Sequence, residues 1–455
     1  MLTETAASAT YRRDLGNGLI LRWSTPEDTE NIAKLSGYVF REKEDEPQNE
    51  NIMSWIRLLM SGQHPLMGQN DYAVIEDPKK EGNPLVASMC MLRQEWTYEG
   101  VPFMIGRPEI VASDPAYRNR GLIRALFELF HARSAAEGHL VQAITGIFYF
   151  YRQFGYEYTL DLGGARSVPL SLIPQAKEGE SEPYTLRDAN EDDMPVILKA
   201  YESRRDTGIV WTTLPPDYLR YQIRQWADIG VPGKRSQAQV IIDTSGKVHG
   251  FMLMIYRRRG KSVFVQMMEV APGVNVQAMM PSVLRALLAY GEQMPVSKTN
   301  TEPISEIALS LGRNHPVYDA LGSLAPTHEP PYTWYVRVAD LPAFIKHSAP
   351  ILQKRLANSA VAGYTGEIKI DFYRGGLRLA FQNGLLTEAE PWRAPIYSAE
   401  PSASFPPLVF LQLLFGHRSL DELRAAFPDA WANNDTTLVL KTLFPTRPSY
   451  VLPLD

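Results

Sequence analysis

A short sequence pattern near the amino terminus recurs 165 residues further along the chain, and this repeat restricts the possible architectures more than any other feature. The two copies are residues 19–28 (LILRWSTPED) and residues 184–193 (YTLRDANEDD). Each copy predicts a short strand, an acidic turn with helix-capping side chains and the start of an amphipathic helix. A second pair of similar segments, 123–127 (IRALF) and 284–288 (LRALL), follows in the same order. We therefore expect two copies of one unit.

The segments between and after the repeats predict mixed sheets that are flanked by helices. In the first copy, alternating runs predict strands, and they are followed by a helix and a further strand, at residues 72–76, 84–93, 103–112, 121–137 and 139–145. The last part of the chain has its own pattern of helices and strands, at residues 341–358, 366–372, 376–382 and 406–415. Polar, helix-breaking residues predict linkers at 174–183 and near 325–331. The expected fold class is α/β (mixed α+β), with domains at residues 1–175, 183–330 and 335–455.

Composition excludes several classes of function. The chain has 46 Lys and Arg against 51 Asp and Glu, a net charge of −5, so no broad basic surface for nucleic acid is expected. The single cysteine, Cys90, excludes an internal disulfide and a thiolate zinc cage. No histidine lies three or four residues from another, so we expect no metal site.

The sequence also lacks the common targeting and phosphate-binding signals. Residues 1–10 contain no apolar signal region, and no run approaches the roughly 18 apolar residues of a membrane span. The Walker, dinucleotide and serine-hydrolase motifs are missing as well. We therefore expect a cytoplasmic protein with no membrane partner.

Residues 109–124 (EIVASDPAYRNRGLIR) predict a strand that leads through a basic turn into a helix. The first N–H groups of a helix lack intrahelical partners and lie at the positive end of the helix dipole, so they favour anions. Gly121 would let a pyrophosphate approach closely, and Arg118, Arg120 and Arg124 add positive charge. A surface turn with solvated arginines is the alternative interpretation, and the surrounding pattern favours an anion cradle.

The motif Arg118-x-x-Gly121 resembles the RxxGxG/A motif of the GCN-five-related N-acetyltransferases (GNAT), which holds the acetyl-CoA pyrophosphate. Ile123 occupies the third motif position, where the general motif has a small residue. This departure resembles the motif of the Eis-like branch of the superfamily. Residues 150–156 (FYRQFGY) resemble the Y-x-x-F-G-Y segment of the family. Residues 414–419 (LFGHRS) and 443–448 (LFPTRP) resemble the carboxy-terminal motifs of Eis-like proteins, which consist of two fused GNAT units and a sterol-carrier-like α+β domain.

The resemblance implies an acetyl-CoA-dependent N-acetyltransferase that assembles as a hexamer and uses no metal. The residues that it places against acetyl-CoA are Val111, Ala112, Ser113, Arg118, Asn119, Arg120, Gly121, Leu122, Ile123, Arg124, Gly146 and Ile147. In the second unit the matching turn, residues 269–277 (EVAPGVNVQ), contains no arginine. We therefore expect one cofactor site in each chain.

Acetyl transfer to an amine needs a base for the ammonium group and an acid for the leaving thiolate, and both roles can be assigned. The family match implies Tyr151 as the acid, with Tyr149 as its nearest rival. Two carboxylates compete as the base. One is Glu109. The other is the terminal carboxylate of Asp455, which the resemblance implies because the chain end of Eis-like proteins reaches the active site.

The expected acceptor is a small-molecule amine. The acidic run that includes Glu42 would attract a cationic amine, and Phe40 would form part of an apolar wall with Tyr38 and Trp55. Eis-like relatives imply an aminoglycoside or a polyamine. A protein lysine or amino-terminal amine is a second candidate acceptor, and a non-catalytic protein that binds an apolar ligand is a third interpretation.

Overall fold

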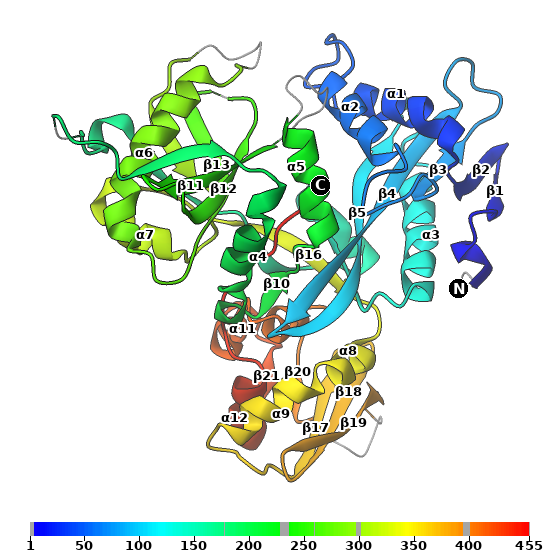
Figure 1. Ribbon diagram of the computed structural model, residues 1–455. Helices are drawn as coiled ribbons and strands as arrows, with labels where there is room; N and C mark the ends of the chain where they lie inside the picture. Colours follow the sequence, from blue (N-terminus) through cyan, green and yellow to red (C-terminus); the bar gives the residue numbers. More distant parts are fainter. Residues whose placement is uncertain are drawn as a thin grey trace.

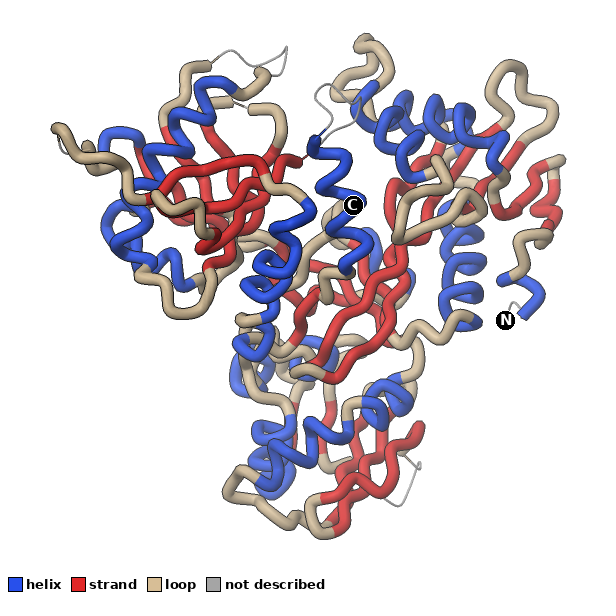
Figure 2. The backbone as a smooth tube through the Cα atoms, viewed as in Figure 1, coloured by secondary structure: helices blue, strands red, loops and turns tan. Residues whose placement is uncertain are grey.

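The computed structural model describes residues 4–176, 178–227, 236–258, 260–296, 302–394 and 401–454. These residues form three sheets, of nine, seven and five strands, and helices cover the faces of the sheets (Figures 1 and 2). The expected fold class, a mixed α/β protein with mixed sheets flanked by helices, is confirmed. None of the described helices combines the length and the apolar character of a membrane span.

The first sheet has the strand order β1-β2-β3-β4-β5-β6-β16-β7, and β10 pairs with β4. Its strands are β1 (Arg12–Gly16), β2 (Leu19–Trp23), β3 (Tyr72–Glu76), β4 (Leu85–Tyr98), β5 (Val101–Ser113), β6 (Val141–Ile144), β7 (Glu157–Leu162), β10 (Val210–Thr212) and β16 (Tyr332–Val338). Its helices are α1 (Thr29–Val39), α2 (Glu50–Leu59) and α3 (Leu122–Ala136).

Alternation along β3 and β4 separates the two faces of this sheet. Cys90 and Leu92 pack in the core beneath α1 and α2, whereas Met89 and Met91 pack in the core beneath α3. Successive side chains of a strand point to opposite faces, so a run that is apolar at every position can fill both cores. This explains why residues 85–92 are all buried.

The second sheet has the strand order β15-β8-β14-β13-β12-β11-β9. Its strands are β8 (Ala165–Pro169), β9 (Tyr184–Asp188), β11 (Ser236–Asp243), β12 (Val248–Ile255), β13 (Ser262–Val270), β14 (Glu306–Leu309) and β15 (Thr327–Glu329). The helices that accompany it are α4 (Met194–Glu202), α5 (Pro216–Ala227), α6 (Val276–Gln293) and α7 (Pro316–Leu321).

Two strands cross between the halves of the molecule. β8 follows the first half in sequence but pairs with β14 and β15 of the second sheet. β16 follows the second half but lies between β6 and β7 of the first sheet. Sheet membership therefore crosses the boundaries that we expected from the sequence, at residues 175 and 330.

The repeated sequence pattern makes the same local structure in both sheets. Arg22 donates to both carboxylate oxygens of Asp28, at 2.6 and 2.9 Å, and Arg187 donates to both oxygens of Asp193, at 2.7 Å each. Each aspartate also closes a capping box at the start of the next helix. The two segments, 165 residues apart, therefore share hydrogen bonds as well as similar residues.

The third sheet has the order β19-β18-β17-β20-β21, and it lies below the first sheet in Figure 1. Its strands are β17 (Gly366–Asp371), β18 (Gly376–Gln382), β19 (Leu385–Trp392), β20 (Ala403–Ser404) and β21 (Trp431–Ala432). Its helices are α8 (Leu341–His347), α9 (Ala349–Ala357), α10 (Phe410–Leu414), α11 (Leu420–Ala426) and α12 (Asn434–Leu443). The single helix expected over 341–358 is divided between α8 and α9, because Pro350 lies in the first turn of α9 and cannot continue a preceding helix.

The carboxy-terminal segment, residues 448–454, returns to the middle of the molecule beside α5 (Figure 1). It runs along β10, where the Ile209 N–H donates to Pro448 O at 2.8 Å and the Tyr450 N–H donates to Val210 O at 2.9 Å. These bonds place the end of the chain between the first and second sheets.

Candidate active site

The central strand β5 separates from its neighbour β6 partway along its length. The two strands pair in parallel only at Ile105 with Val141 and at Gly106 with Gln142, although β5 continues along β4 to Ser113. A bulge near Ile110, which has a φ of +49°, adds to the distortion of β5. In the described part of the chain, the β6 side of residues 107–113 is therefore a strand edge without a strand partner. Such an edge can bind an extended, amide-containing chain by backbone hydrogen bonds.

Val111, Ala112 and Ser113 lie on this edge, and the basic turn follows directly. Asp114 caps the short helix of residues 115–117, and α3 begins after Gly121, whose φ of +76° requires a left-handed conformation. A side chain added at Gly121 would meet no atom within 4 Å, so the approach to the start of α3 is open. The unpaired N–H groups at the start of α3, from Leu122 onward, suit an anionic ligand.

The charged side chains of the turn are exposed, as an anion cradle requires. Arg118, Arg120 and Arg124 are all exposed, and Asn119 beside them adopts a left-handed φ of +62°. The Arg120 guanidinium lies 4.7 Å from the ring centroid of Tyr117, and that of Arg124 lies 5.4 Å from that of Phe154. The aromatic contacts hold two of the three guanidinium groups near the start of α3. The predicted cofactor residues of this turn are therefore adjacent in space as well as in sequence.

Tyr151 and its rival Tyr149 lie in different environments. Tyr151 is 4% exposed, whereas Tyr149 is 68% exposed. Burial, and then the negative charge of Glu109, raises the pKa of the Tyr151 hydroxyl. The hydroxyl oxygen lies 4.0 Å from the point where a side chain on Gly146 would begin. Tyr151 is therefore a protonated hydroxyl at neutral pH, close to the backbone of a predicted cofactor residue.

The segment of Gly146 and Ile147 is held by a strand that arrives from far along the chain. Tyr332 of β16 donates to Gly146 O at 2.8 Å, and Tyr335 of the same strand donates to Ile147 O at 3.0 Å. The hydroxyl oxygens of Tyr335 and Tyr158 also lie 2.6 Å apart, within hydrogen-bond distance. Sequence reasoning missed these tyrosines, and the only signal for them was the aromatic run at residues 332–335.

One candidate base, Glu109, and Leu454, the residue before the other candidate, contact the same buried arginine. Arg107 is 2% exposed; its Nη2 donates to Glu109 Oε2 at 2.5 Å, and its Nη1 donates to the main-chain oxygen of Leu454 at 2.8 Å. Gln94 donates to the same Leu454 oxygen at 3.0 Å. Asp455 lies outside the described residues, but its neighbour is thus held beside Glu109. Sequence reasoning missed Arg107 and Gln94, although a charged residue inside an apolar strand was a signal for Arg107.

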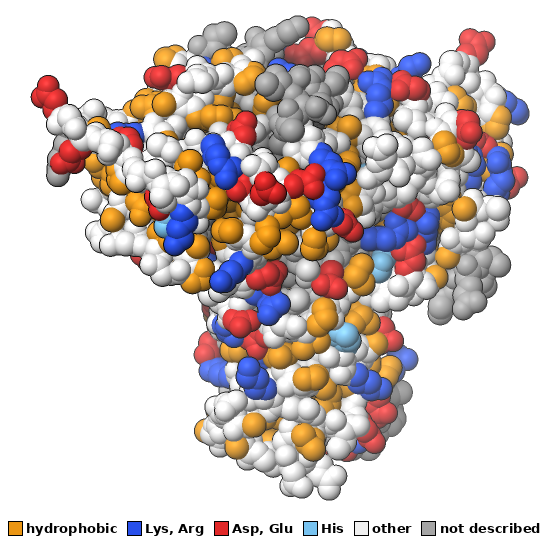
Figure 3. Space-filling model, viewed as in Figure 1, with side chains coloured by type: hydrophobic (Ala, Val, Ile, Leu, Met, Phe, Trp, Pro, Cys, Tyr) orange, Lys and Arg blue, Asp and Glu red, His pale blue; other side chains and the backbone are white. Residues whose placement is uncertain are grey.

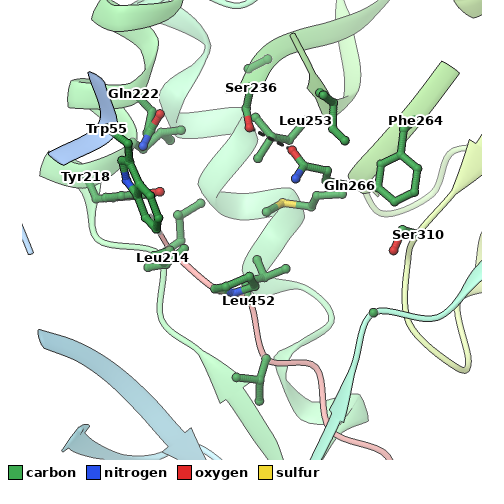
Figure 4. Close-up of a pocket in the computed structure, with 18 of the residues that line it drawn as sticks. Trp55, Leu214, Tyr218, Gln222, Ser236, Leu253, Phe264, Gln266, Ser310 and Leu452 are labelled. Carbon is green, nitrogen blue, oxygen red and sulfur yellow. Dashed lines mark hydrogen bonds between the residues drawn. The ribbon is translucent and has the colours of Figure 1, made fainter. Parts of the chain in front are cut away.

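A cavity of about 840 Å³ adjoins this end of the chain (Figure 4). Its wall is formed by α2, α5, the second sheet and the carboxy-terminal segment, with Trp55, Tyr218, Phe264 and Leu452 among the labelled side chains. Glu42, which the sequence predicts as a substrate residue, is among the residues that line the cavity. Phe40 is exposed and does not belong to the described wall, so the structure does not bring it together with Glu42 at this site.

Residues 21–159 match the sequence model of a family described as "Acetyltransferase (GNAT) domain". The chain thus carries a GNAT acetyltransferase domain. GNAT acetyltransferases use acetyl-CoA as the acetyl donor. No curated protein matches the chain.

Solved structures share the fold over nearly the whole length of the chain. A GCN5-related N-acetyltransferase from Kribbella flavida is 16% identical, with 95% of this chain and 98% of that chain covered and a TM-score of 0.62. A probable N-acyltransferase from Enterococcus faecalis V583 is 15% identical (94% and 96% covered, TM-score 0.63). Eis1 from Mycobacterium abscessus is 12% identical (94% and 98% covered, TM-score 0.57). At these identities the likeness concerns the fold.

The GNAT domain contains most of the predicted site. The edge of β5, the basic turn, Gly146, Ile147 and Tyr151 all lie within the matched residues. The tyrosines of β16 and the carboxy-terminal segment lie outside it, yet they contact its cofactor-side and base-side residues. Parts of the chain that follow the second sheet therefore contact residues of the predicted site.

Proposed function

We propose that the chain transfers the acetyl group of acetyl-CoA to a primary amine at the GNAT domain. The observation that carries this proposal is the course of β5, whose free edge leads directly into the open basic turn before α3. The edge at Val111, Ala112 and Ser113 suits the amides of the pantetheine arm, and the turn suits the pyrophosphate. One ligand with both features is acetyl-CoA.

In this proposal each chemical role falls to a residue of the chain. A carboxylate accepts a proton from the substrate ammonium, and the neutral amine then forms a C–N bond with the acetyl carbonyl. Backbone N–H groups of residues 111–113 stabilise the negative charge that develops on the carbonyl oxygen. As the C–S bond breaks, Tyr151 donates its hydroxyl proton to the departing sulfur. The nitrogen then loses its second proton to the Tyr151 phenolate, which restores the hydroxyl and leaves a neutral amide. Burial of Tyr151, which keeps the hydroxyl protonated, supports its role as the acid.

The base is one of two carboxylates, Glu109 or the terminal group of Asp455. The contacts of Arg107 support both, because one guanidinium binds the side chain of Glu109 and the backbone next to Asp455. The negative charge of Glu109 also raises the pKa of Tyr151, so a Glu109 variant alters the proposed acid as well, and removal of Asp455 is the independent test of the base.

We further propose that the second sheet belongs to a degenerate GNAT unit without a cofactor site. The repeated Arg–Asp pairs support a common origin of the two units. In the second unit the segment that matches the basic turn begins at Glu269. This residue is 1% exposed and pairs with Arg204 at 2.7 Å, so it belongs to the core. The resemblance to Eis-like proteins supports a sterol-carrier-like third domain, a hexamer and a cytoplasmic location as parts of the same proposal.

The acceptor class that the resemblance supports is an aminoglycoside or another polyamine, and the position of Glu42 at the cavity agrees with a cationic group there. A protein lysine or amino-terminal amine is the second candidate. A cavity of about 840 Å³ is the size of a small-molecule site, which supports a small-molecule acceptor.

The test follows binding of acetyl-CoA by calorimetry and release of free CoA with a panel of amines. We expect wild-type protein to bind acetyl-CoA and to release CoA only when an amine is present. The base is identified with two variants, Glu109→Gln and a chain that lacks Asp455. The variant that has lost the base should release CoA slowly at neutral pH. Absence of acetyl-CoA binding by the wild type would overturn the proposal, including the alternative acceptors.

A further inference from the structure

The cavity beside the carboxy-terminal segment has few charged groups. The acidic and basic side chains among its described lining residues are Glu42, His64, Asp161 and Arg257. Asp161 accepts two hydrogen bonds from Arg313, at 2.7 and 2.9 Å, so its charge is already compensated. Glu42 and Arg257 are exposed and carry opposite charges. The described wall therefore offers no set of buried carboxylates for a polycation.

The remaining described wall combines apolar side chains with uncharged polar ones, among them the amides of Asn49 and Gln222 and the hydroxyl of Ser310. Trp55 of α2 and Tyr218 of α5 face Leu253 and Phe264 of the second sheet across the space in Figure 4. Ser236 donates to the side-chain oxygen of Gln266 at 2.9 Å, and this pair lies on the wall with further amide and hydroxyl groups. Such a wall accommodates an apolar body and orients it through neutral hydrogen bonds.

One end of the cavity is formed in part by Leu454. The main-chain oxygen of Leu454 binds Arg107, which also binds Glu109. Because Arg107 links this end of the cavity to Glu109, it is the end from which an amine would reach that carboxylate. An amine at the apolar end would have to shed its water without a compensating charge, which is strongly unfavourable.

We infer that the acceptor is a lipophilic monoamine: one primary amine, directed toward Leu454, on an apolar and partly aromatic body that fills the cavity. This inference rests on the proposed function and narrows its acceptor class. The volume of about 840 Å³ suits a small-molecule body of this kind. Additional ammonium groups on the same body weaken binding, because the described wall offers no buried carboxylate with an uncompensated charge to pair with them.

The test compares octylamine with diaminooctane, which have the same chain and differ by one ammonium group, and 4-phenylbutylamine with spermidine. We expect the value of kcat/KM for CoA release to be at least about tenfold higher for the monoamine of each pair. Calorimetric titration of each amine into the protein without acetyl-CoA should rank the affinities in the same order. This second readout does not depend on turnover.

A single charge added to the wall should reverse part of this preference. Gln266→Glu keeps an oxygen for the Ser236 hydroxyl and introduces a carboxylate, so we expect the diamine-to-monoamine ratio to rise at least about fivefold. Gln382→Glu, on exposed β18 of the third sheet, adds the same charge away from the cavity and should leave the ratio unchanged.

Tighter binding and faster turnover of diaminooctane and spermidine by the wild type would overturn the inference. An unchanged ratio in Gln266→Glu would overturn it as well. A protein that binds octylamine in the expected order but neither binds acetyl-CoA nor releases CoA would contradict the proposed function and leave the assignment of the cavity supported.

Discussion

The guanidinium of Arg107 donates a hydrogen bond of 2.8 Å to the main-chain oxygen of Leu454, although the two residues lie 347 positions apart. The same guanidinium binds Glu109, so the end of the chain and a candidate base share one buried cation. This contact joins the GNAT domain to the carboxy-terminal segment. It also makes the geometry of the site depend on the whole chain.

Replacement of Arg107 by methionine should destabilise the protein and lower its rate of CoA release. The change leaves the Glu109 carboxylate and one bond of the Leu454 oxygen without their donor in a buried place, which costs about 2–4 kcal/mol. The free energy of unfolding in urea measures the first effect and CoA release the second. Arg418→Met, which removes an exposed arginine paired with Glu422, is the control and should cost less than about 1 kcal/mol. Equal unfolding free energies for the two variants would contradict the role of Arg107.

Replacement of Arg118 by alanine should weaken binding of CoA without a change in stability. Arg118 is exposed at the basic turn, and loss of one charge-assisted contact to a pyrophosphate raises the Kd by about tenfold. Calorimetry should find the same loss for ADP, which contains a pyrophosphate, and none for pantetheine, which does not. Arg374→Ala, at an exposed turn of the third sheet, serves as the control. If Arg118→Ala bound CoA with the same Kd as the wild type, the proposed role of the basic turn in pyrophosphate binding would be contradicted.

The rate should not fall on the alkaline side until the pH is well above the ordinary pKa of tyrosine. Burial and then the charge of Glu109 raise the pKa of Tyr151, so the acid form persists as the pH rises. We expect kcat to rise as the base loses its proton and then to stay level past about pH 10, the ordinary pKa of tyrosine. Tyr151→Phe should lower kcat by about a hundredfold at every pH, whereas Tyr149→Phe, at an exposed position, should not. Equal kcat values for Tyr151→Phe and Tyr149→Phe would rule out Tyr151 as the acid.

The repeated Arg–Asp pairs should make equivalent, acid-sensitive contributions to stability. Burial alone would raise the pKa of Asp28 and Asp193, but hydrogen bonds from Arg22 and Arg187 outweigh it and lower both pKa values. A lowered pKa in the folded state gives stability that is present above the unfolded pKa and is lost as the pH falls through the folded one. Asp28→Asn and Asp193→Asn should each cost about 1–3 kcal/mol near pH 7 and less near pH 3, as measured by urea unfolding. Asp192→Asn, at an exposed position, is the control, and a cost independent of pH would contradict the explanation.

Much of the site's local structure could be predicted from its residues. The strand, basic turn and helix expected over 109–124 are β5, the short helix 115–117 and α3. Three features signal this arrangement within a few residues of one another: an alternating apolar run, a proline after a capping aspartate and a glycine before a helix. The assignments of Tyr151 as acid and of Glu109 or Asp455 as base stay predictions.

The arrangement around those residues could not be predicted in the same way. The apolar wall that the sequence suggested for the substrate included Phe40, which does not belong to the described wall of the cavity. Helix α5 and the second sheet supply a large part of that wall. The acidic run near Glu42 suggested a polycation, but the buried part of the wall is apolar and amide-rich. Charge along a sequence does not reveal which side chains a fold gathers around one space.

The amino-acid sequence by itself determined the structures in which neighbouring residues supply all the partners. The turn before α3 and the Arg22–Asp28 capping arrangement are of this kind, because their bonds span only a few positions. Only the tertiary structure decided that Leu454 meets Arg107 and that Tyr335 meets Tyr158, since these contacts join residues 347 and 177 positions apart. Such contacts depend on how three sheets and the carboxy-terminal segment pack together, and no local periodicity encodes that packing.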